Sequence, residues 1–231
     1  MTSTTSAQAL AEEIAAAHGG TERWRRVAEV DVSFSARGLA FLSKGQPTTL
    51  STVIGRFGTA TQSVSLQGQR PRLWSYDAED GAALLIAVQR LSNGRRLRWT
   101  IADAATFAAT AMWTYLNIPF LLLDPGFSLE VLPSEGRELR RLRVRFPPEL
   151  ATHSPHQILH IDANGLIRRH DYTAHAIGRW AAGSQLLDEY EEFDGIRFAT
   201  RRHVTPRLRG YRLPGPTLVR IELQDLKFVA N

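Results

Sequence analysis

Apolar and polar residues alternate along most of this chain, a period of two that is typical of β-strands with one buried face. The pattern first appears at Val30, Val32 and Phe34, each followed by a polar residue. Similar short segments recur to the C-terminus, separated by glycine, proline or asparagine. We expect further strands over residues 49–57, 59–66, 72–76, 83–88, 95–101, 129–132, 139–146, 157–162, 166–174, 184–193, 196–204 and 217–228.

Two parts of the chain depart from this alternation and predict helices. Near the N-terminus, residues 7–18 are rich in alanine with apolar positions near helical spacing, and a short second helix is expected over 21–27. In mid-chain, Asp103 is placed to cap a helix over residues 104–116, which ends before Pro119.

The order of these elements predicts the fold. Many short strands with one helix inserted halfway are typical of a mostly antiparallel sheet, not of βαβ units. We predict a mainly β (α+β) fold, in which a curved antiparallel half-barrel sheet has an N-terminal helix and holds the mid-chain helix against its concave face. The 231 residues are expected to form one domain. Its segments are the N-terminal helices (1–27), a first strand meander (28–101), the helix with an apolar connector (103–127) and a second strand meander (128–231).

Composition narrows the classes of function. The chain contains no cysteine, which excludes disulfides, thiolate metal sites and cysteine nucleophiles. A net charge of +5 is compatible with nucleic-acid binding, but the acidic cluster at residues 188–192 would repel phosphate, so we expect no nucleic-acid partner. No apolar run is long enough to span a bilayer, and the N-terminal segment lacks the pattern of a secretory signal. These features predict a cytoplasmic protein without stable membrane insertion.

The richest candidate chemistry lies in a predicted hairpin with the turn Asp162-Ala163-Asn164-Gly165. This sequence favours a three-residue loop with a bulge, which sets Asp162 opposite Leu166. Because side chains alternate between the two faces of a strand, this register gathers six residues on one face. They are His156, Ile158, His160, Arg168, His170 and Tyr172. The other face carries Gln157, Leu159, Ile161, Ile167, Arg169 and Asp171.

We interpret the histidine-bearing face as a candidate catalytic surface inside a cavity. Histidine titrates near neutral pH and transfers protons in both directions, so His170 is the first candidate for a general acid or base. Tyr172 and His156 are its neighbours, and Arg168 would bind a carboxylate or stabilise an oxyanion. The alternative is that this face is exposed to solvent and that the opposite face belongs to the core.

A cavity is expected where the mid-chain helix meets the curved sheet. The helix carries a stripe of aromatic residues, and the connector after it, residues 118–127, is too apolar for an ordinary surface loop. The same stripe is also typical of a plain core. The candidate ligand contacts are Trp113, Tyr115, Phe120, His153 and His160.

Metal and cofactor sites have less support in the sequence. His160 and His170 would lie diagonally across the hairpin within reach of a shared ion, but no further ligand motif accompanies them. The sequence contains no glycine-rich phosphate loop and no nucleophile elbow. We therefore expect neither a metal nor a cofactor. In the last hairpin, acidic residues 189–192 are expected to pair with Arg201 and Arg202 on the neighbouring strand.

Several segments resemble a bacterial protein family of about this length that has no assigned activity. They are HGGTERW (18–24), AMWTYLNIPFLLLDPGF (111–127), THSPHQILHIDANGLIRRHDYTAHAIG (152–178) and EYEEFDGIRFATRRHVTPR (189–207). The hairpin followed by FDGI is similar to the lipoprotein-localisation (LolA/LolB-like) superfamily. This resemblance implies a half-barrel of antiparallel strands with helices on its concave side, and the binding of acyl chains or other apolar ligands.

Two hypotheses of function follow from the sequence. In the first, the chain is a cofactor-independent enzyme of specialised metabolism (a cyclase, isomerase, lyase or hydrolase), in which His170, Tyr172 and Arg168 move a proton or stabilise charge on an apolar substrate. In the second, it is a non-catalytic cytoplasmic carrier of a lipid or hydrophobic metabolite, and the same polar groups anchor a headgroup. Both predict an apolar small-molecule partner, and both leave the oligomeric state open.

Overall fold

One open, curved sheet makes up most of the molecule. The computed structural model describes residues 6–94, 96–135 and 139–230. The start of the predicted N-terminal segment (residues 1–5) and the start of the predicted strand over 95–101 (Arg95) therefore lie outside the described residues. The sheet runs in the order β4-β3-β2-β1-β12-β10-β9-β8-β7-β6-β5, with β11 paired to β10 off this path. The strands are β1 (Val27–Arg37), β2 (Thr52–Gly58), β3 (Val64–Arg70), β4 (Trp74–Ala78), β5 (Ser128–Glu135), β6 (Leu139–Arg145), β7 (His156–Ile161), β8 (Ile167–Thr173), β9 (Ala182–Phe193), β10 (Ile196–Leu208), β11 (Tyr211–Arg212) and β12 (Val219–Ala230).

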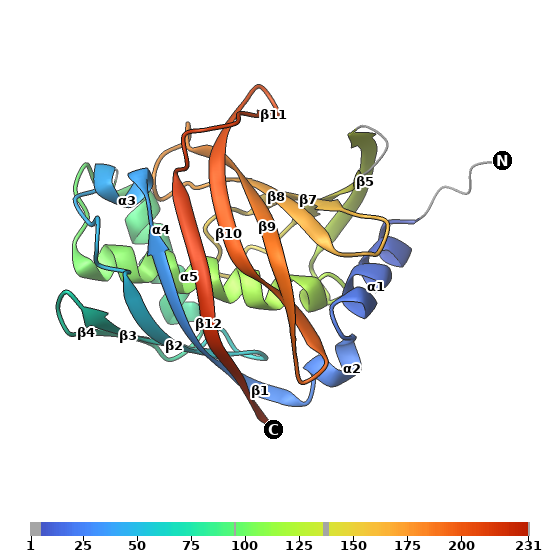
Figure 1. The fold of residues 1–231 in the computed structure, drawn as a ribbon, viewed down its shortest axis with the longest axis horizontal. Coiled ribbons are helices and arrows are strands. Elements are labelled where there is room, and N and C mark those ends of the chain that lie inside the picture. The colour runs from blue at the N-terminus through green and yellow to red at the C-terminus, as the bar shows by residue number, and fades with distance from the viewer. Residues whose placement is uncertain (1–5, 95, 136–138, 231) are drawn as a thin grey trace.

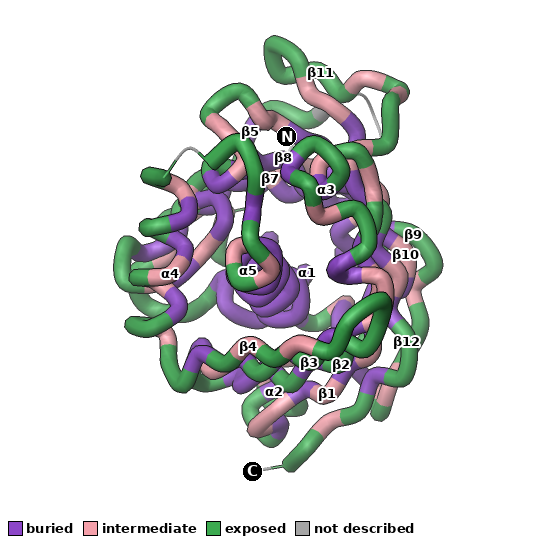
Figure 2. Tube along the Cα trace, turned by 90° about the vertical axis from the view of Figure 1, so that its left-hand side faces the viewer, coloured by how far each residue is buried: buried purple, intermediate pink, exposed green. Residues whose placement is uncertain are grey.

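Each pair of neighbouring strands is antiparallel, and the contact between β1 and β12 joins the first and last parts of the chain. The sheet bends around the long helix α5, which runs through its concave side (Figure 1). Figure 2 shows the same helix in cross-section, enclosed by strands and buried along its length. The predicted fold class, a curved antiparallel sheet around a mid-chain helix, is confirmed. The helices are α1 (Ala7–Ala17), α2 (Thr21–Trp24), α3 (Leu39–Ser43), α4 (Gly81–Asn93) and α5 (Ile101–Leu121).

Helix α5 is longer than its sequence pattern predicts. Thr100 is the N-cap, and Asp103 is the third helical residue of a capping box: its backbone N–H donates to the Thr100 hydroxyl at 3.1 Å, and its carboxylate accepts from the Thr100 N–H at 2.8 Å. The helix therefore begins three residues earlier than expected, with Thr100 and not Asp103 as its N-cap. The helix also continues through Pro119 to Leu121. All its residues from 104 to 121 are buried, because it is apolar on every side and the sheet surrounds it.

Helix α4 replaces one expected strand. Residues 83–88 lie in α4, where Asp80 is the N-cap and accepts from the Ala83 N–H at 2.8 Å. Leu84, Val88 and Leu91 are its buried residues, at helical spacing. A short apolar run is compatible with both a buried strand and a helix. Here the N-cap and the spacing of the buried residues favour the helix. The expected strand over 95–101 is also absent from the described part, in which residues 96–100 lead irregularly into α5.

The core has two parts. The larger one packs α5 against β1 to β4, β10 and β12, and contains Trp24 as the sequence predicts. The smaller one packs α1 and the end of α5 against β6, β7 and β8. Among the described residues, no helix combines the length and the hydrophobicity needed to cross a bilayer.

Candidate functional site

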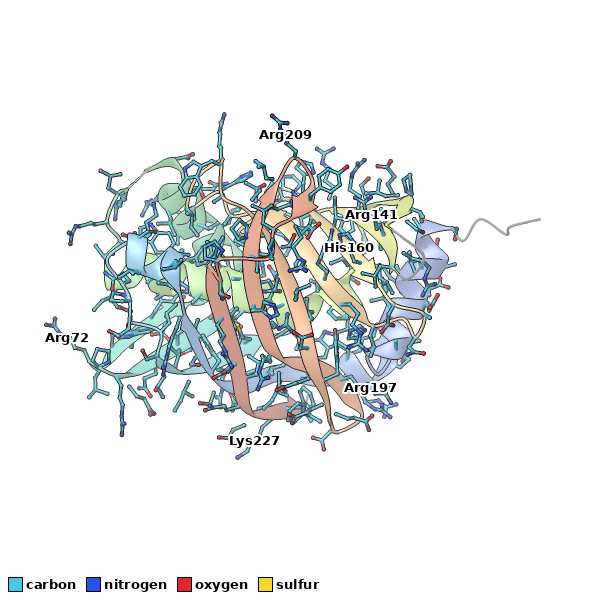
Figure 3. The ribbon with its side chains drawn as sticks, turned by 45° about the horizontal axis from the view of Figure 1, so that its top comes forward. Arg72, Arg141, His160, Arg197, Arg209 and Lys227 are labelled. Atoms are coloured by element: carbon cyan, nitrogen blue, oxygen red, sulfur yellow. The ribbon has the colours of Figure 1, made fainter. Side chains whose placement is uncertain are left out.

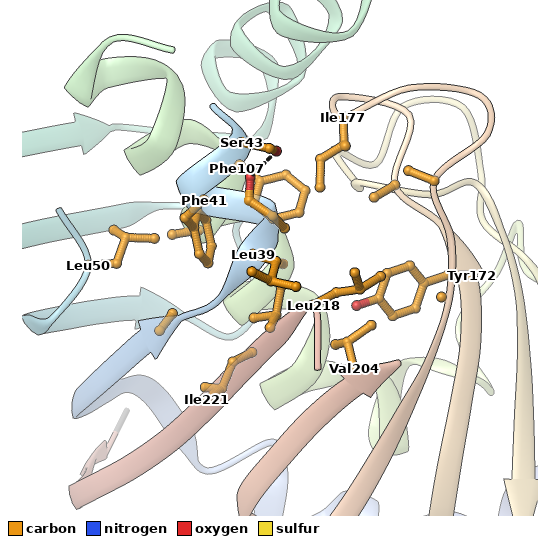
Figure 4. Close-up of a pocket in the computed structure, with 18 of the residues that line it drawn as sticks. Leu39, Phe41, Ser43, Leu50, Phe107, Tyr172, Ile177, Val204, Leu218 and Ile221 are labelled. Carbon is orange, nitrogen blue, oxygen red and sulfur yellow. Dashed lines mark hydrogen bonds between the residues drawn. The ribbon is translucent and has the colours of Figure 1, made fainter. Parts of the chain in front are cut away.

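A cavity of about 330 Å³ lies between helix α5 and the concave face of the sheet (Figure 4). Its walls are the middle of α5, helix α3, parts of β1, β10 and β12, and the segment that joins β8 to β9. Apolar side chains form most of the wall, among them Phe34, Leu39, Phe41, Leu50, Phe107, Met112, Ile177, Val204, Leu218 and Ile221. Such a surface binds apolar molecules by removing their area from water.

Small residues keep this volume open. Ala108 and Ala111 on α5 line it, as do Ala36 on β1, Ala174 after β8 and Gly183 on β9. A larger side chain at these positions would occupy part of the space between helix and sheet. Protein interiors are otherwise close-packed, with few voids larger than a water molecule. The cavity is therefore built by small residues at positions that face one another across it.

Two buried tyrosines give the apolar wall a polar point. The Tyr115 hydroxyl on α5 donates to the Tyr172 hydroxyl on β8 at 3.0 Å. Burial raises the pKa of Tyr115 to about 12 and, together with the neighbouring Tyr115, holds the pKa of Tyr172 well above 10, so both hydroxyls stay protonated. Among the described residues, no acceptor takes the proton of Tyr172, whose hydroxyl points into the cavity in Figure 4. This hydroxyl is free to donate one hydrogen bond to a ligand.

Two other polar side chains of the wall, Ser43 and Arg207, each have a hydrogen-bond partner. The Ser43 hydroxyl donates to the Ala40 carbonyl at 2.8 Å. Arg207 donates to the carboxylate of Asp171, on the other face of the sheet, at 3.4 Å. The tyrosine pair is therefore the polar group best placed to orient a bound molecule.

Two histidines pack directly behind the tyrosines. The ring of His153 lies 4.6 Å from that of Tyr172, and the ring of His170 lies 5.3 Å from it, between centroids. His170 Nε2 is hydrogen-bonded to the side-chain oxygen of Gln157, whereas neither ring nitrogen of His153 has a partner among the described residues. Burial lowers the pKa of His153 to about 3 and that of His170 well below 6.5, so both rings are neutral at physiological pH.

Arg202 is buried beneath the tyrosine pair. Its guanidinium lies 5.1 Å from the centre of the Tyr115 ring, and its Nη2 approaches the Tyr115 carbonyl at 3.5 Å. That carbonyl lacks its helical donor, because Pro119 four residues later has no N–H. No carboxylate pairs with Arg202 in the described part of the chain, and burial lowers its pKa. Arg202 therefore contacts both the ring and the carbonyl of Tyr115, and these two contacts help to fix the position of Tyr115.

The predicted histidine face is wrong in register. The turn is as expected: Gly165 has a φ of +83°, and the Asp162 N–H donates to the Leu166 carbonyl at 3.0 Å. A β-bulge then shifts the pairing, so that His160 lies opposite Arg169 and Arg168 is the extra residue. The hairpin consequently presents two mixed sets of residues. Gln157, Leu159, His170 and Tyr172 share the concave face, and His156, Ile158, His160, Arg169 and Asp171 share the other.

The structure thus separates the predicted catalytic residues. Tyr172 reaches the cavity and His170 lies behind it, while His156 is exposed on the other face. His160 is buried on that other face, where its Nε2 contacts the carboxylate of Asp171 at 2.9 Å. Arg168 is half-exposed and pairs with Asp162 at 2.7 Å, well away from the cavity wall.

The predicted ligand contacts on α5 are divided in the same way. Tyr115 lines the cavity. Trp113 lies elsewhere on the helix and donates its indole N–H to the Gly58 carbonyl at 2.7 Å. Phe120 stacks on Trp24 with 4.4 Å between ring centroids, so the first half of the apolar connector, residues 118–122, is part of the packed core, whereas residues 123–126 are exposed. His153 is close to the cavity but separated from it by the tyrosines.

Sequence reasoning missed Arg202 and helix α3. Ile196, Phe198, Thr200, Arg202 and Val204 alternate along β10, and this spacing would have placed Arg202 on the buried face. Of the two arginines expected to pair with the acidic cluster, Arg201 does so by contacting Glu189, whereas Arg202 is buried under Tyr115. In the described part of the chain, no three His, Asp or Glu side chains gather as metal ligands do.

Comparisons with known proteins found similar solved structures but no match by sequence. No family model and no curated protein matches it. A DUF1329 family protein from Desulfovibrio piger is similar over 97% of this chain and 94% of its own, at 10% identity and a TM-score of 0.49. A LolA superfamily protein from Nitrosomonas europaea is similar over 99% of this chain and 96% of its own, at 12% identity and a TM-score of 0.48. Neither similarity carries information on a ligand or an activity.

Proposed function

We propose that the protein binds an apolar small molecule in the cavity beside α5, and that Tyr172 donates a hydrogen bond to a polar group on that molecule. The observation that carries this proposal is an apolar cavity of about 330 Å³ whose tyrosine hydroxyl has an uncommitted proton. Small-molecule sites occupy roughly 300–1,000 Å³ and combine an apolar wall with a few placed polar groups. The cavity lies at the lower end of that range and fits a small or slender ligand.

The polar group of the ligand is expected to be an uncharged acceptor, such as a carbonyl, ether or hydroxyl oxygen. Tyr172 stays protonated and can only donate its remaining hydrogen. Arg202, the nearest buried cation, does not line the cavity, because Tyr115 stands in between. A carboxylate would lose its hydration there, and the cation that does line the wall, Arg207, already contacts the carboxylate of Asp171, so an uncharged acceptor costs less to bury.

Binding explains the geometry better than acid–base catalysis by histidine does. His170 is held by Gln157 and lies behind the tyrosines, outside the cavity wall. Its pKa lies well below neutral, because burial and the neighbouring His153 and Arg202 disfavour the charged ring. A general acid or base works best with a pKa near the operating pH and must touch the proton that it moves.

A second candidate function keeps the cavity and adds catalysis by Tyr172. The observation that favours it is the chain of polar groups behind the hydroxyl, in which Arg202 contacts Tyr115 and Tyr115 donates to Tyr172. In this alternative, Tyr172 donates a proton or a strong hydrogen bond to a substrate during a cofactor-independent cyclisation, isomerisation, elimination or hydrolysis. The carrier and the enzyme share their ligand site and differ in what happens to the ligand.

Mass spectrometry of molecules extracted from the purified protein separates these two functions. A carrier with Tyr172→Phe would retain the same molecule as the native protein, at lower occupancy. An enzyme with Tyr172→Phe would accumulate a different molecule, its unconverted substrate. Recovery of one identical compound from both proteins therefore argues for the carrier.

The binding proposal is tested by titration with N-phenylnaphthylamine, an uncharged apolar probe that fluoresces when it leaves water. Ala111→Phe places a ring inside the cavity, and we expect it to abolish binding of the probe. Ala102→Phe is the matched control, because Ala102 lies on the exposed first turn of the same helix. Equal binding by the native protein and by Ala111→Phe would exclude this cavity as the site.

A further inference from the structure

Three segments that surround the mouth of the cavity carry exposed apolar side chains. They are residues 37–48, 174–183 and 205–218, and each contributes to the cavity wall. We call them the rim. Its exposed large apolar residues are Leu39, Leu42, Trp180, Leu208 and Tyr211. Trp180 is 79% exposed and Tyr211 is 72% exposed, unusual values for residues that normally bury their rings.

The rim is also strongly basic. Its three segments contain Arg37, Lys44, Arg179, Arg207, Arg209 and Arg212, and no aspartate or glutamate. The whole chain is far more balanced, with 28 basic and 23 acidic residues. Lys44 is buried against backbone carbonyls and Arg207 contacts Asp171, which leaves four exposed arginines. No ion pair involves these four within the described residues.

This combination matches the surface of an anionic lipid membrane. Aromatic and aliphatic tips enter the boundary between headgroups and acyl chains, while arginines remain at the level of the phosphates. A second copy of the chain fits poorly, because two rims would bring like charges together. Nucleic acid would use the arginines but would leave Leu39, Leu42 and Leu208 exposed to water.

We propose that the rim docks the protein on an anionic membrane with the mouth of the cavity facing the lipid. Figure 3 shows Arg209 at the tip of the β10–β11 hairpin, directed away from the body of the molecule. In this orientation an apolar ligand passes between bilayer and cavity with little exposure to water. The docking itself does not depend on the proposed ligand and is tested without one.

The test measures binding to vesicles of phosphatidylcholine, with and without phosphatidylglycerol, by co-sedimentation at low and high salt. We expect binding to the anionic vesicles, a marked loss at high salt, and weak binding to the neutral ones. Arg179→Gln and Arg212→Gln should each weaken binding about fivefold, and together about 25-fold. Trp180→Ser should also weaken it, and brominated lipid should quench Trp180 in the native protein.

A matched control uses the far end of the molecule. Arg72→Gln with Leu73→Ser removes one exposed cation and one exposed apolar side chain at a place remote from Arg209 (Figure 3). This variant should bind anionic vesicles as the native protein does. The arginine variants and the control variant, none of which changes a residue of the cavity wall, should retain binding of N-phenylnaphthylamine, which shows that fold and cavity are intact.

Four results would overturn the proposal. They are equal binding to neutral and anionic vesicles, no binding to either, an equal loss in the control variant, and binding of a nucleic-acid duplex through Arg179 and Arg212 without vesicle binding. If vesicles bind but the probe does not, docking stands and the ligand site falls. If the probe binds but vesicles do not, the ligand site stands and the docking proposal falls.

Discussion

Replacing His153 by phenylalanine tests the environment of the ring behind the tyrosine pair. The side chain is 1% exposed, packs edge-on against Phe107, Tyr115 and Tyr172, and has no hydrogen-bond partner for either ring nitrogen within the described residues. A buried polar group without a partner costs about 1–3 kcal/mol, and phenylalanine removes that cost while keeping a ring in place. Phenylalanine also changes the packing around the ring, so the test compares stability at two pH values.

The pH dependence separates the protonation of His153 from this change in packing. His153 has a pKa near 3 in the folded protein because of its burial, whereas an unfolded histidine titrates near 6.5. Since the folded pKa is the lower one, the neutral ring stabilises the fold fully above pH 6.5, and this contribution is lost as the pH falls toward the folded pKa. Between pH 7 and pH 5 only the unfolded chain takes up the proton, which costs the native protein about 2 kcal/mol of stability. Phenylalanine binds no proton, so the variant escapes this loss.

The assay is urea denaturation of native and His153→Phe protein at pH 7 and pH 5. The stability difference between variant and native protein should be about 2 kcal/mol larger in favour of the variant at pH 5 than at pH 7. Packing effects cancel in this comparison, and so do contributions of His18 and His170, which are present in both proteins. A shift below about 0.5 kcal/mol would refute the reasoning, because it would mean that the folded protein accepts a proton at His153.

Two further substitutions test the hairpin. Asp171→Asn should destabilise the fold by at least about 2 kcal/mol in denaturant titrations, because the buried carboxylate accepts charged hydrogen bonds from Arg169 at 3.0 Å and contacts His160 at 2.9 Å. These bonds hold the pKa of Asp171 well below its usual value although burial acts to raise it, so the native protein should lose the stability that the carboxylate contributes only in strong acid. A denaturation midpoint that the substitution leaves unchanged would contradict the stabilising role of these bonds. Gly165→Ala should cost about 1–2 kcal/mol, because the residue has a φ of +83° and a Cβ there would lie 2.8 Å from that of Ala17; an unchanged melting temperature would show that α1 does not rest on the turn.

Local chemistry in the sequence was sufficient to predict the turn but not the register after it. The Asp162–Gly165 sequence specifies the loop, and the structure has that loop. The bulge at Arg168 inserts one unpaired residue into β8, and no residue pattern announces it. Because one extra residue exchanges the two faces, a correct turn still led to a wrong set of cavity residues.

The curved sheet and its central helix were predictable for a different reason. Alternation over many strands, together with one long apolar helix, leaves few architectures that bury both. Helix α4 was missed because a run such as Ala82 to Val88 fits both a buried strand and a helix. The cavity depends on small residues such as Ala108 and Gly183 that meet only in three dimensions, so the sequence indicated a hollow but not its wall.

The most direct measurement is a crystal structure of the protein grown with bromo-octanol, whose bromine is located by its anomalous scattering. We predict a single bromine peak inside the cavity among Phe34, Leu50 and Ala111, and the alcohol oxygen within hydrogen-bonding distance of the Tyr172 hydroxyl. Bromine found only on the outer surface, or a cavity closed by rearranged side chains with no alcohol in it, would contradict the account.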